Sequence, residues 1–126
     1  AGDDVVCKPL FGAQGRGLER LAPRAGLPDG ERLGGVYYLQ DFVEGPRGQE
    51  GARDWRVFVI GGRAVAAMTR HAPGWITNVH QGGVPRPAPA DSPAGRLAVA
   101  AAEAVGADYA GVDLIEDCSG RFLVLE

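Results

Sequence analysis

Two acidic side chains near the end of the chain lie within apolar runs, where carboxylates are rare. Asp113 sits between Val112 and Leu114, and Glu126 closes the run of residues 122–126. A carboxylate in an apolar strand is costly unless a positive charge lies beside it. A hard divalent cation such as Mg²⁺ takes oxygen ligands of this kind and often shares them with phosphate groups. The pair therefore indicates a magnesium site, although Glu126 alone would also fit an acid that turns back to solvent at a strand end.

The spacing of the two acids predicts which way they point. A polar turn at residues 117–120 separates the apolar runs and predicts a β-hairpin. If Glu116 pairs with Arg121 across this turn, Asp113 and Glu126 become diagonal neighbours on one face, with backbones about 7–8 Å apart. A slip of one residue would place them on opposite faces. The even-numbered turn thus predicts that both acids reach one Mg²⁺.

A lysine and a glycine-rich loop form a second candidate site. Lys8 ends an apolar strand within residues 3–10, and Gly12, Gly15 and Gly17 follow it. Glycines let a backbone bend tightly and present bare N–H groups to phosphate oxygens, and a lysine adds a point charge. The pattern matches neither the P-loop nor the dinucleotide-binding fingerprint, so an ordinary glycine-rich hairpin is the alternative interpretation.

The middle of the chain carries the clearest local structure. Residues 55–60 and 63–70 predict two strands joined by a two-glycine hairpin turn. Alternation along the first strand places Asp54, Arg56 and Phe58 on one face and Trp55, Val57 and Val59 on the other. Asp54 and Arg56 would then form a surface ion pair or point together into a cleft.

Turn and cap residues predict the remaining elements. Residues 36–43 are rich in β-branched and aromatic side chains and predict a strand, whereas residues 22–35 and 71–89 predict loops. The second of these loops carries polar side chains suited to a binding site. A helix begins after the N-cap Ser92 and ends before Gly106. Its packing face is predicted from a four-residue spacing: Leu97, Ala101 and Val105.

Composition limits the class of protein. With 126 residues, 45% of them hydrophobic and 23% charged, the chain suits one globular domain or two small lobes. A net charge of −3 without a basic block argues against nucleic-acid binding, and no apolar run approaches the ~18 residues of a membrane span. The distant cysteines Cys7 and Cys118 predict free thiols in a reducing, cytoplasmic environment. Because the chain begins without Met and stops on an apolar strand, we expect it to be part of a longer one.

Six motifs follow one another along the chain: V-V-C-K-P-L-F-G-A-Q-G-R-G, Y-L-Q-D-F-V, D-W-R-V-F-V-I-G-G-R-A-V-A-A-M-T-R, I-T-N-V-H-Q-G-G, A-G-V-D-L-I and L-V-L-E. In this order they resemble the ATP-grasp ligases, and among these the RimK-like branch, over nearly the whole chain. The resemblance implies an α+β ATP-grasp fold, with two lobes built on antiparallel strands and nucleotide between them. The lobes would comprise residues 1–44 and residues 54–126, joined by a connector of residues 45–53.

The resemblance also implies roles for individual residues. The residues that would bind the nucleotide lie in both lobes: Lys8, Gly12, Gly15, Gly17, Gln40, Asp41, Phe42, Asp54 and Asn78. Lys8 resembles the lysine that contacts the phosphates, and Asp41 resembles part of the hinge at the adenine. Arg70 resembles a catalytic arginine that binds phosphate. Asp113 and Glu126 resemble the carboxylates that hold Mg²⁺, for which Mn²⁺ is an alternative.

The activity implied by the resemblance is the ATP-dependent joining of a carboxylate to an amine through an acyl phosphate. The partners would be ATP, a protein or small-molecule acceptor, and an amino acid such as glutamate, and an oligomer could form through further regions. Family members carry an N-terminal domain and continue past the final glutamate as Glu-Val-Asn, so we expect this stretch alone to be inactive. Ile76 stands where the RimK-like branch often has arginine, which bears on the choice of amino acid. The alternatives are a nucleotide-binding or regulatory module without turnover and a purely structural α+β domain.

Overall fold

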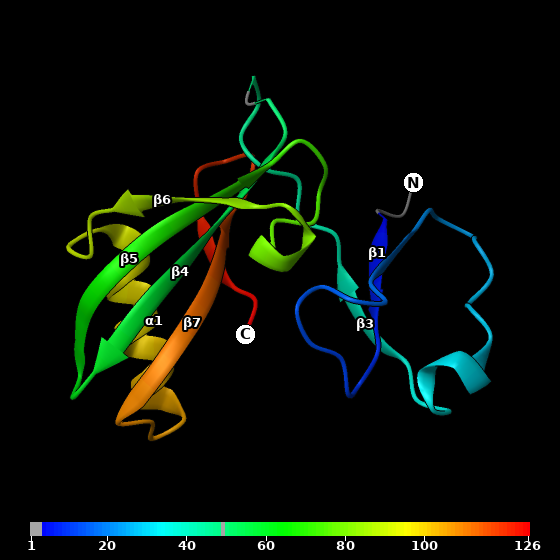
Figure 1. Ribbon diagram of the computed structural model, residues 1–126, viewed down its shortest axis with the longest axis horizontal. Helices are drawn as coiled ribbons and strands as arrows, with labels where there is room; N and C mark the ends of the chain where they lie inside the picture. The colour runs from blue at the N-terminus through cyan, green and yellow to red at the C-terminus, as the bar shows by residue number, and fades with distance from the viewer. Residues whose placement is uncertain (1–3, 49) are drawn as a thin grey trace. The chain divides into compact units, whose positions relative to one another are not determined.

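The chain forms two compact units. The computed structural model describes residues 4–48 and 50–126. The first unit ends at Val43, and the second runs from Glu44 to Glu126. Each unit has its own antiparallel sheet, which we call the smaller sheet and the larger sheet (Figure 1). The α+β character predicted from the sequence is confirmed.

The smaller sheet is built around a buried strand. β1 (Val5–Lys8) lies between β2 (Glu19–Leu21) and β3 (Tyr38–Asp41), and both neighbours run antiparallel to it. Val6 and Cys7 are buried, as the apolar run predicts. The strand predicted for residues 36–43 exists but is confined to its four central residues.

The stretch of residues 22–35 was predicted to be an irregular loop, but part of it is regular. It contains the 3₁₀ helix η1 (Gly30–Leu33). Asp29 begins this helix, because its carboxylate accepts a hydrogen bond of 3.0 Å from the backbone N–H of Glu31. Local capping by an aspartate therefore organises a segment whose sequence lacks a hydrophobic period.

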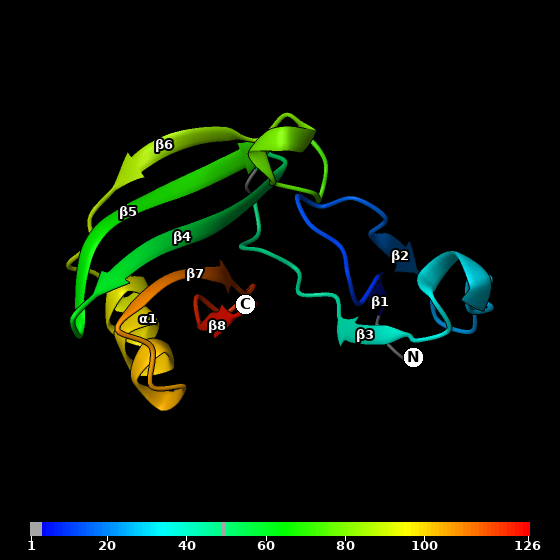
Figure 2. The same cartoon turned by 60° about the horizontal axis from the view of Figure 1, so that its bottom comes forward.

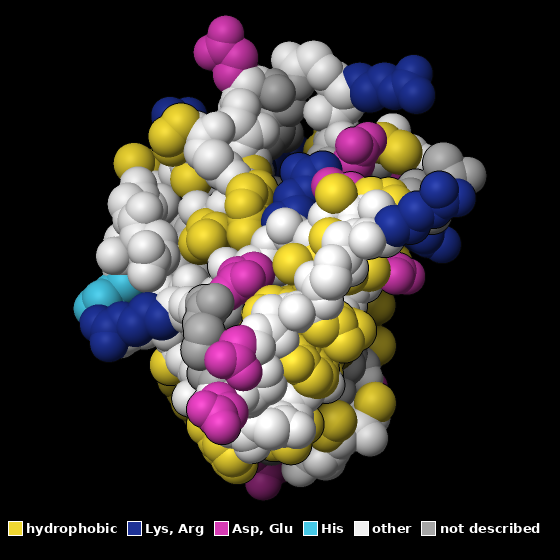
Figure 3. All heavy atoms as spheres, turned by 90° about the vertical axis from the view of Figure 1, so that its right-hand side faces the viewer, with side chains coloured by type: hydrophobic (Ala, Val, Ile, Leu, Met, Phe, Trp, Pro, Cys, Tyr) yellow, Lys and Arg dark blue, Asp and Glu magenta, His cyan; other side chains and the backbone are white. Residues whose placement is uncertain are grey.

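Exposed apolar side chains are frequent in the first unit. Figure 3 shows one face of the molecule, on which hydrophobic side chains lie among charged ones. Phe11, in the glycine-rich loop, is 98% exposed, and Leu10 and Leu27 are also exposed. The first unit thus buries far fewer large side chains than the second, whose core is described next.

The larger sheet has the strand order β6-β5-β4-β7-β8, and all its neighbouring strands are antiparallel. Its elements, in chain order, are β4 (Ala52–Ile60), β5 (Arg63–Ala72), the 3₁₀ helix η2 (Val79–Gln81), β6 (Val84–Ala88), α1 (Pro93–Ala104), β7 (Tyr109–Glu116) and β8 (Phe122–Val124). The two-glycine hairpin between β4 and β5 is confirmed, with Ile60 opposite Arg63. β4 begins earlier than predicted, because Ala52 and Arg53, which had been assigned to the connector, already pair with β5.

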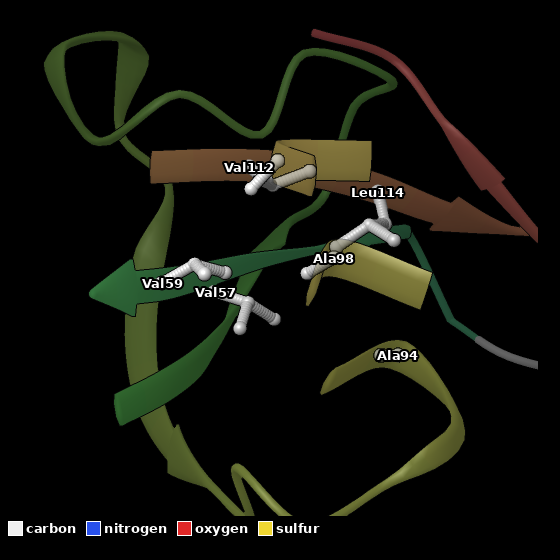
Figure 4. Close-up of a cluster of buried hydrophobic side chains, with 7 residues drawn as sticks. Val57, Val59, Ala94, Ala98, Val112 and Leu114 are labelled. Carbon is white, nitrogen blue, oxygen red and sulfur yellow. The ribbon is translucent and has the colours of Figure 1, made fainter. Parts of the chain in front are cut away.

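The core of the second unit lies between the larger sheet and α1, which packs along one face of it (Figure 2). Alternate residues of the central strands point to this side, including Val57, Val59, Val112 and Leu114 (Figure 4). The predicted alternation of β4 is therefore correct. Burial of each such side chain stabilises the fold by about 1.5–3 kcal/mol.

The helix starts as predicted but packs through a different face. Ser92 is its N-cap, and its hydroxyl accepts a hydrogen bond of 3.1 Å from the backbone N–H of Gly95. The buried residues of α1 are Ala94, Gly95, Ala98 and Ala102. Leu97 and Ala101 lie at the edge of this face, whereas Val105 is 78% exposed. Small residues face the sheet because they let the helix backbone approach it closely, and this outweighs the hydrophobicity that favoured Val105.

The predicted loop at residues 71–89 is partly regular structure. β5 extends through Ala72, η2 follows, and β6 pairs with β5. β6 contains Pro85 and Pro87. Proline is tolerated in edge strands, where an N–H is not required on the open side, and β6 lies at the edge of the larger sheet.

Two further expectations concern thiols and membranes. Cys7 and Cys118 are both free, as predicted, with the first buried and the second exposed. Burial and the nearby charge of Glu19 raise the pKa of the Cys7 thiol. Within the part of the chain that the structure describes, no helix has the length and apolar character needed to cross a membrane.

Candidate functional site

Four charged side chains meet on the larger sheet, on the face opposite to the apolar core. Asp54 and Arg70 are directly opposite each other on β4 and β5, and Arg56 is directly opposite Asp113 on β4 and β7. We call these four residues the charged cluster. Their backbone positions follow from alternation, because their neighbours Val57 and Leu114 point to the core on the other face.

Arginine side chains join the two carboxylates of the charged cluster. Arg70 donates from Nε to Asp54 Oδ1 at 2.8 Å, and from Nη2 to Asp54 Oδ2 at 2.5 Å and to Asp113 Oδ2 at 2.9 Å. Arg56 donates from Nε to Asp113 Oδ1 and from Nη2 to Asp113 Oδ2, each at 2.6 Å. Both oxygens of Asp113 are therefore engaged by guanidinium groups.

Burial makes these contacts electrostatically strong. The side chains of Asp54, Arg70 and Asp113 are each less than 10% exposed, whereas that of Arg56 is 33% exposed. Burial works to lower the pKa of Arg70, but its hydrogen bonds and the charges of both aspartates outweigh this and raise the pKa above its ordinary value. Arg70 is thus a permanent cation whose orientation is fixed by two carboxylates.

The surface ion pair between Asp54 and Arg56, one of the two alternatives predicted for them, does not form. Both residues lie on the same face, as predicted, but each finds its partner across a neighbouring strand rather than along its own. Directly opposite residues have Cβ atoms about 4.5–5.5 Å apart, which is closer than residues two positions apart on one strand. Arg56 was not among the functional residues predicted from the sequence. Its signal was an arginine in phase with Asp54 in a strand that is otherwise largely apolar.

The turn of the final hairpin also differs from the prediction. Glu116 is opposite Phe122, not Arg121, so the register is shifted by one residue. The backbone N–H of Asp117 donates to Arg121 O at 2.8 Å, and that of Gly120 donates to Asp117 O at 3.0 Å. Gly120 has a positive φ of 84°, which lets it add one residue to the turn. The loop between the paired residues is therefore odd-numbered, against the even number that the prediction assumed.

A β-bulge follows the shifted register and brings Glu126 beside Asp113. The N–H of Asp113 donates to Glu126 O at 2.7 Å, while Leu125 N and Glu126 N lie 2.8 and 3.4 Å from Asp113 O. Two residues of the last segment thus oppose one residue of β7. The backbones of the two predicted metal ligands are direct neighbours, although by a different register from the one predicted.

The donors at this place suit a hard cation in kind, since carboxylate oxygens are the ligands that Mg²⁺ prefers. The Glu126 side chain is exposed, and the Asp113 carboxylate is paired with arginines. Within the described ranges, His, Cys, Asp and Glu side chains form no group of three or more that could hold a metal ion. The positive charge expected beside a carboxylate in an apolar strand is supplied at Asp113 by guanidinium groups.

Lys8 and the glycine-rich loop belong to the first unit. The ammonium group of Lys8, at the end of β1, lies 5.7 Å from the centre of the Tyr38 ring. Gly15 and Gly17 both have φ of 72°, which side chains disfavour, so the loop depends on glycine there. At Gly12, an added Cβ would lie 2.6 Å from Pro9 Cγ. The sequence therefore specifies a tight loop directly after the lysine.

The predicted hinge residues lie at the end of β3. Gln40 is half-buried, and its Oε1 is buried without a hydrogen-bond partner among the described residues. Asp41 is exposed, and the Phe42 ring lies 3.6 Å from the guanidinium carbon of Arg20. The N–H of Phe42 donates to Asp4 O at 2.8 Å, which continues the pairing beyond the strand.

Asn78 lies in the turn before β6. Its backbone oxygen accepts hydrogen bonds from Gln81 N at 2.8 Å and from Gly83 N at 3.1 Å. A Cβ on Gly83 would lie 1.8 Å from Thr77 O, so only glycine permits this close approach. Asn78 precedes η2, but its side chain makes no capping hydrogen bond there. The amide is thus held in a compact turn without being used by it.

Comparison with known proteins places the chain in a family. The model of the RimK-like ATP-grasp domain matches residues 5–126, and the chain belongs to this family. It is 42% identical over 124 residues to a tetrahydromethanopterin:alpha-L-glutamate ligase of Methanococcus maripaludis, covering 94% of this chain and 42% of the relative. It is 38% identical over 128 residues to a probable alpha-L-glutamate ligase of Mannheimia succiniciproducens, covering 97% of this chain and 41% of that relative.

A solved structure supports the fold. The ATP-grasp ligase PsnB, in a complex with minimal precursor, Mg and ADP, superposes with a TM-score of 0.66 at 24% identity. The match covers 98% of this chain and 36% of that one. The chain therefore spans less than half the length of the relatives and of the structure that it matches. The ATP-grasp resemblance inferred from the six motifs is confirmed at the level of family and fold.

Proposed function

We propose that this chain forms part of an ATP-dependent carboxylate–amine ligase that joins glutamate to an acceptor through an acyl phosphate. The proposal is supported by membership of the RimK-like ATP-grasp family and by similarity to two proteins named as glutamate ligases. The acceptor, a protein or a small molecule, would be chosen largely by parts of the protein outside these residues. A reducing, cytoplasmic location suits the two free thiols.

The observation that carries the proposal is the buried arginine of the charged cluster. In phosphoryl transfer, charge is spread over the phosphoryl oxygens, so catalysis depends on cations held in place before the reaction. Arg70 is such a cation, since two carboxylates fix its orientation at distances of 2.5–2.9 Å. A buried ion network contributes little net stability compared with apolar residues, which favours a functional reason for its presence.

The remaining candidate residues take complementary roles in this proposal. Lys8 is the only lysine among the 126 residues and would contact the nucleotide phosphates together with the backbone of the glycine-rich loop. The other nucleotide contacts would come from the remaining residues that the resemblance implies: Gly12, Gly15, Gly17, Gln40, Asp41, Phe42, Asp54 and Asn78. Asp113 and Glu126 would hold Mg²⁺, or Mn²⁺ in its place, and the bound cation would neutralise phosphate charge.

The full-length protein tests this function directly. With glutamate, acceptor and Mg²⁺, it should release ADP in proportion to the amide formed. Lys8→Ala should weaken nucleotide binding by about 1.5–3 kcal/mol, the range for a hydrogen bond to a charged group. Arg24→Gln, which removes a positive charge from an exposed position of the same unit, is the matched control and should leave binding unchanged.

The single lysine allows a second readout. Bound nucleotide should protect Lys8 from an amine-acylating reagent, as measured on its peptide by mass spectrometry. Nucleotide binding without ADP release in the presence of candidate acceptors would favour the alternative of a regulatory ATP-grasp module. Unchanged nucleotide affinity in Lys8→Ala would remove this lysine from the site.

A further inference from the structure

The two arginines of the charged cluster are held very differently. Arg70 contacts two aspartates, and its side chain is 4% exposed. Arg56 contacts only Asp113 in the described part of the chain, and its side chain is 33% exposed. If Arg70 moved away, the buried Asp54 would lose both of its hydrogen bonds to this arginine, and Asp113 would keep only those from Arg56. If Arg56 moved, only Asp113 would lose hydrogen bonds, and the guanidinium would reach water.

We infer that Arg56 is a displaceable counter-cation, which occupies the Asp113 carboxylate until a divalent cation takes its place, while Arg70 stays bound. The inference rests on the proposed role of Asp113 in holding the metal. It assigns a function to Arg56, which was not among the functional residues predicted from the sequence.

The contacts of Asp113 favour the exchange. Arg56 donates to both oxygens of Asp113 at 2.6 Å, and Arg70 donates to Oδ2 as well. Oδ1 therefore has Arg56 as its partner, and the guanidinium both occupies one side of this oxygen and repels a second cation that approaches it at the ~2.0–2.1 Å of a magnesium contact. Release of Arg56 frees Oδ1 completely and leaves Oδ2 with its bond to Arg70. The Glu126 backbone next to Asp113 places a second acidic residue at the same point.

Charge balance gives the exchange a consequence. Two arginines and two aspartates make the charged cluster neutral, so Asp113 attracts a free cation only weakly. When a divalent cation replaces Arg56, the cluster gains one positive charge, which favours simultaneous binding of an anion such as a nucleotide phosphate. Arg56 thus weakens metal binding in the absence of nucleotide, because it competes with the metal for the Asp113 carboxylate.

The chain offers a matched control for testing this inference. Arg53 is also on β4, also forms an ion pair of 2.6 Å with a carboxylate of β7, Glu116, and is 28% exposed. Arg53→Gln and Arg56→Gln each remove one positive charge from the same strand. Only the second removes a partner of Asp113, so the difference between the variants separates specific competition from a general change in charge.

The experiment measures Mn²⁺ binding to the full-length protein without nucleotide, by electron paramagnetic resonance of the free ion. We expect Arg56→Gln to bind Mn²⁺ about tenfold more tightly than wild type, and Arg53→Gln within about twofold of wild type, because only Arg56 holds charge-assisted bonds that the metal must break. Asp113→Asn should abolish the binding. Equal affinities for Arg56→Gln and Arg53→Gln, with binding still lost in Asp113→Asn, would overturn the inference and leave the metal site intact. Undiminished binding in Asp113→Asn would overturn both the inference about Arg56 and the proposed role of Asp113 in holding the metal.

A second measurement uses wild-type protein and needs no variant to fold. Nuclear magnetic resonance of arginine side chains follows the Nε–H groups during titration with Mg²⁺ and ADP. We expect the Arg56 Nε–H to lose its protection from exchange with water, while the Arg70 Nε–H, bonded to Asp54 at 2.8 Å, stays protected. Continued protection of both groups at saturating metal would contradict the displacement.

Discussion

The two faces of the larger sheet are built on opposite principles. One is covered by α1 and filled by valine, leucine and alanine, whose contacts are non-directional. The other carries Asp54, Arg70 and Asp113, which are equally buried but are joined by hydrogen bonds of defined geometry. The buried side chains of both faces are removed from water, yet only the apolar ones gain stability from their burial. The difference suggests that the apolar face holds the fold and the charged face serves the chemistry.

Removal of one charge from the charged face should have the largest effect on stability. Arg70→Met leaves Asp54 and Asp113 facing each other with one partner fewer, so we expect a loss of about 3–5 kcal/mol in the free energy of unfolding. Urea unfolding followed by circular dichroism measures it. Replacing the whole network, in the triple variant Asp54→Leu/Arg70→Met/Asp113→Leu, should restore most of this stability. A loss that persists in the triple variant would mean that the network itself stabilises the fold.

A cavity on the apolar face should have a comparable or slightly smaller effect. Leu114 is fully buried between β7 and α1, and Leu114→Ala should cost about 2–5 kcal/mol because neighbouring side chains only partly refill the space. Unlike a change in the charged cluster, it should leave nucleotide affinity unchanged when measured well below the unfolding temperature. Isothermal titration calorimetry with ADP measures this affinity. A loss of affinity in folded Leu114→Ala would contradict the assignment of nucleotide binding to the charged face alone.

An acid in the turn of the final hairpin, outside both faces, should have the smallest effect. The carboxylate of Asp117 accepts hydrogen bonds from the side chain of Ser119 first of all, and from backbone groups of the turn, which lower its pKa from 3.8 to about 2. Because the pKa is depressed in the folded chain, its contribution to stability is present above about pH 4 and is lost as the pH falls through about 2. Titration of the Asp117 carboxyl by nuclear magnetic resonance should show this value. Titration near 3.8 would mean that the turn does not hold the carboxylate.

The sequence predicted the apolar face better than the charged one. Strict alternation in β4, the two-glycine hairpin and the Ser92 cap are local signals, and each was confirmed. The partners of Asp54 and Arg56 were not predictable in the same way, because they depend on which strands become neighbours. The prediction that Val105 packs against the sheet was wrong for a related reason, since the fit of small residues against the sheet decides which face of the helix is buried.

In the final hairpin the predicted register is wrong, yet the backbones of Asp113 and Glu126 are still neighbours. A glycine in the left-handed region at residue 120 made the loop odd-numbered, which the pattern of polar residues did not reveal. The β-bulge at Leu125 and Glu126 then brought Glu126 back beside Asp113. Whether both carboxylates bind one metal stays a prediction.

The division between the two faces can be tested in one measurement, the affinity of the triple variant Asp54→Leu/Arg70→Met/Asp113→Leu for ADP with Mg²⁺ in the full-length protein. We predict a folded protein, with a cooperative urea transition, that binds the nucleotide–metal pair at least about a hundredfold more weakly than wild type, since a charge-assisted contact contributes roughly 1.5–3 kcal/mol. Wild-type affinity in a folded triple variant would contradict the assignment of the charged face to nucleotide and metal.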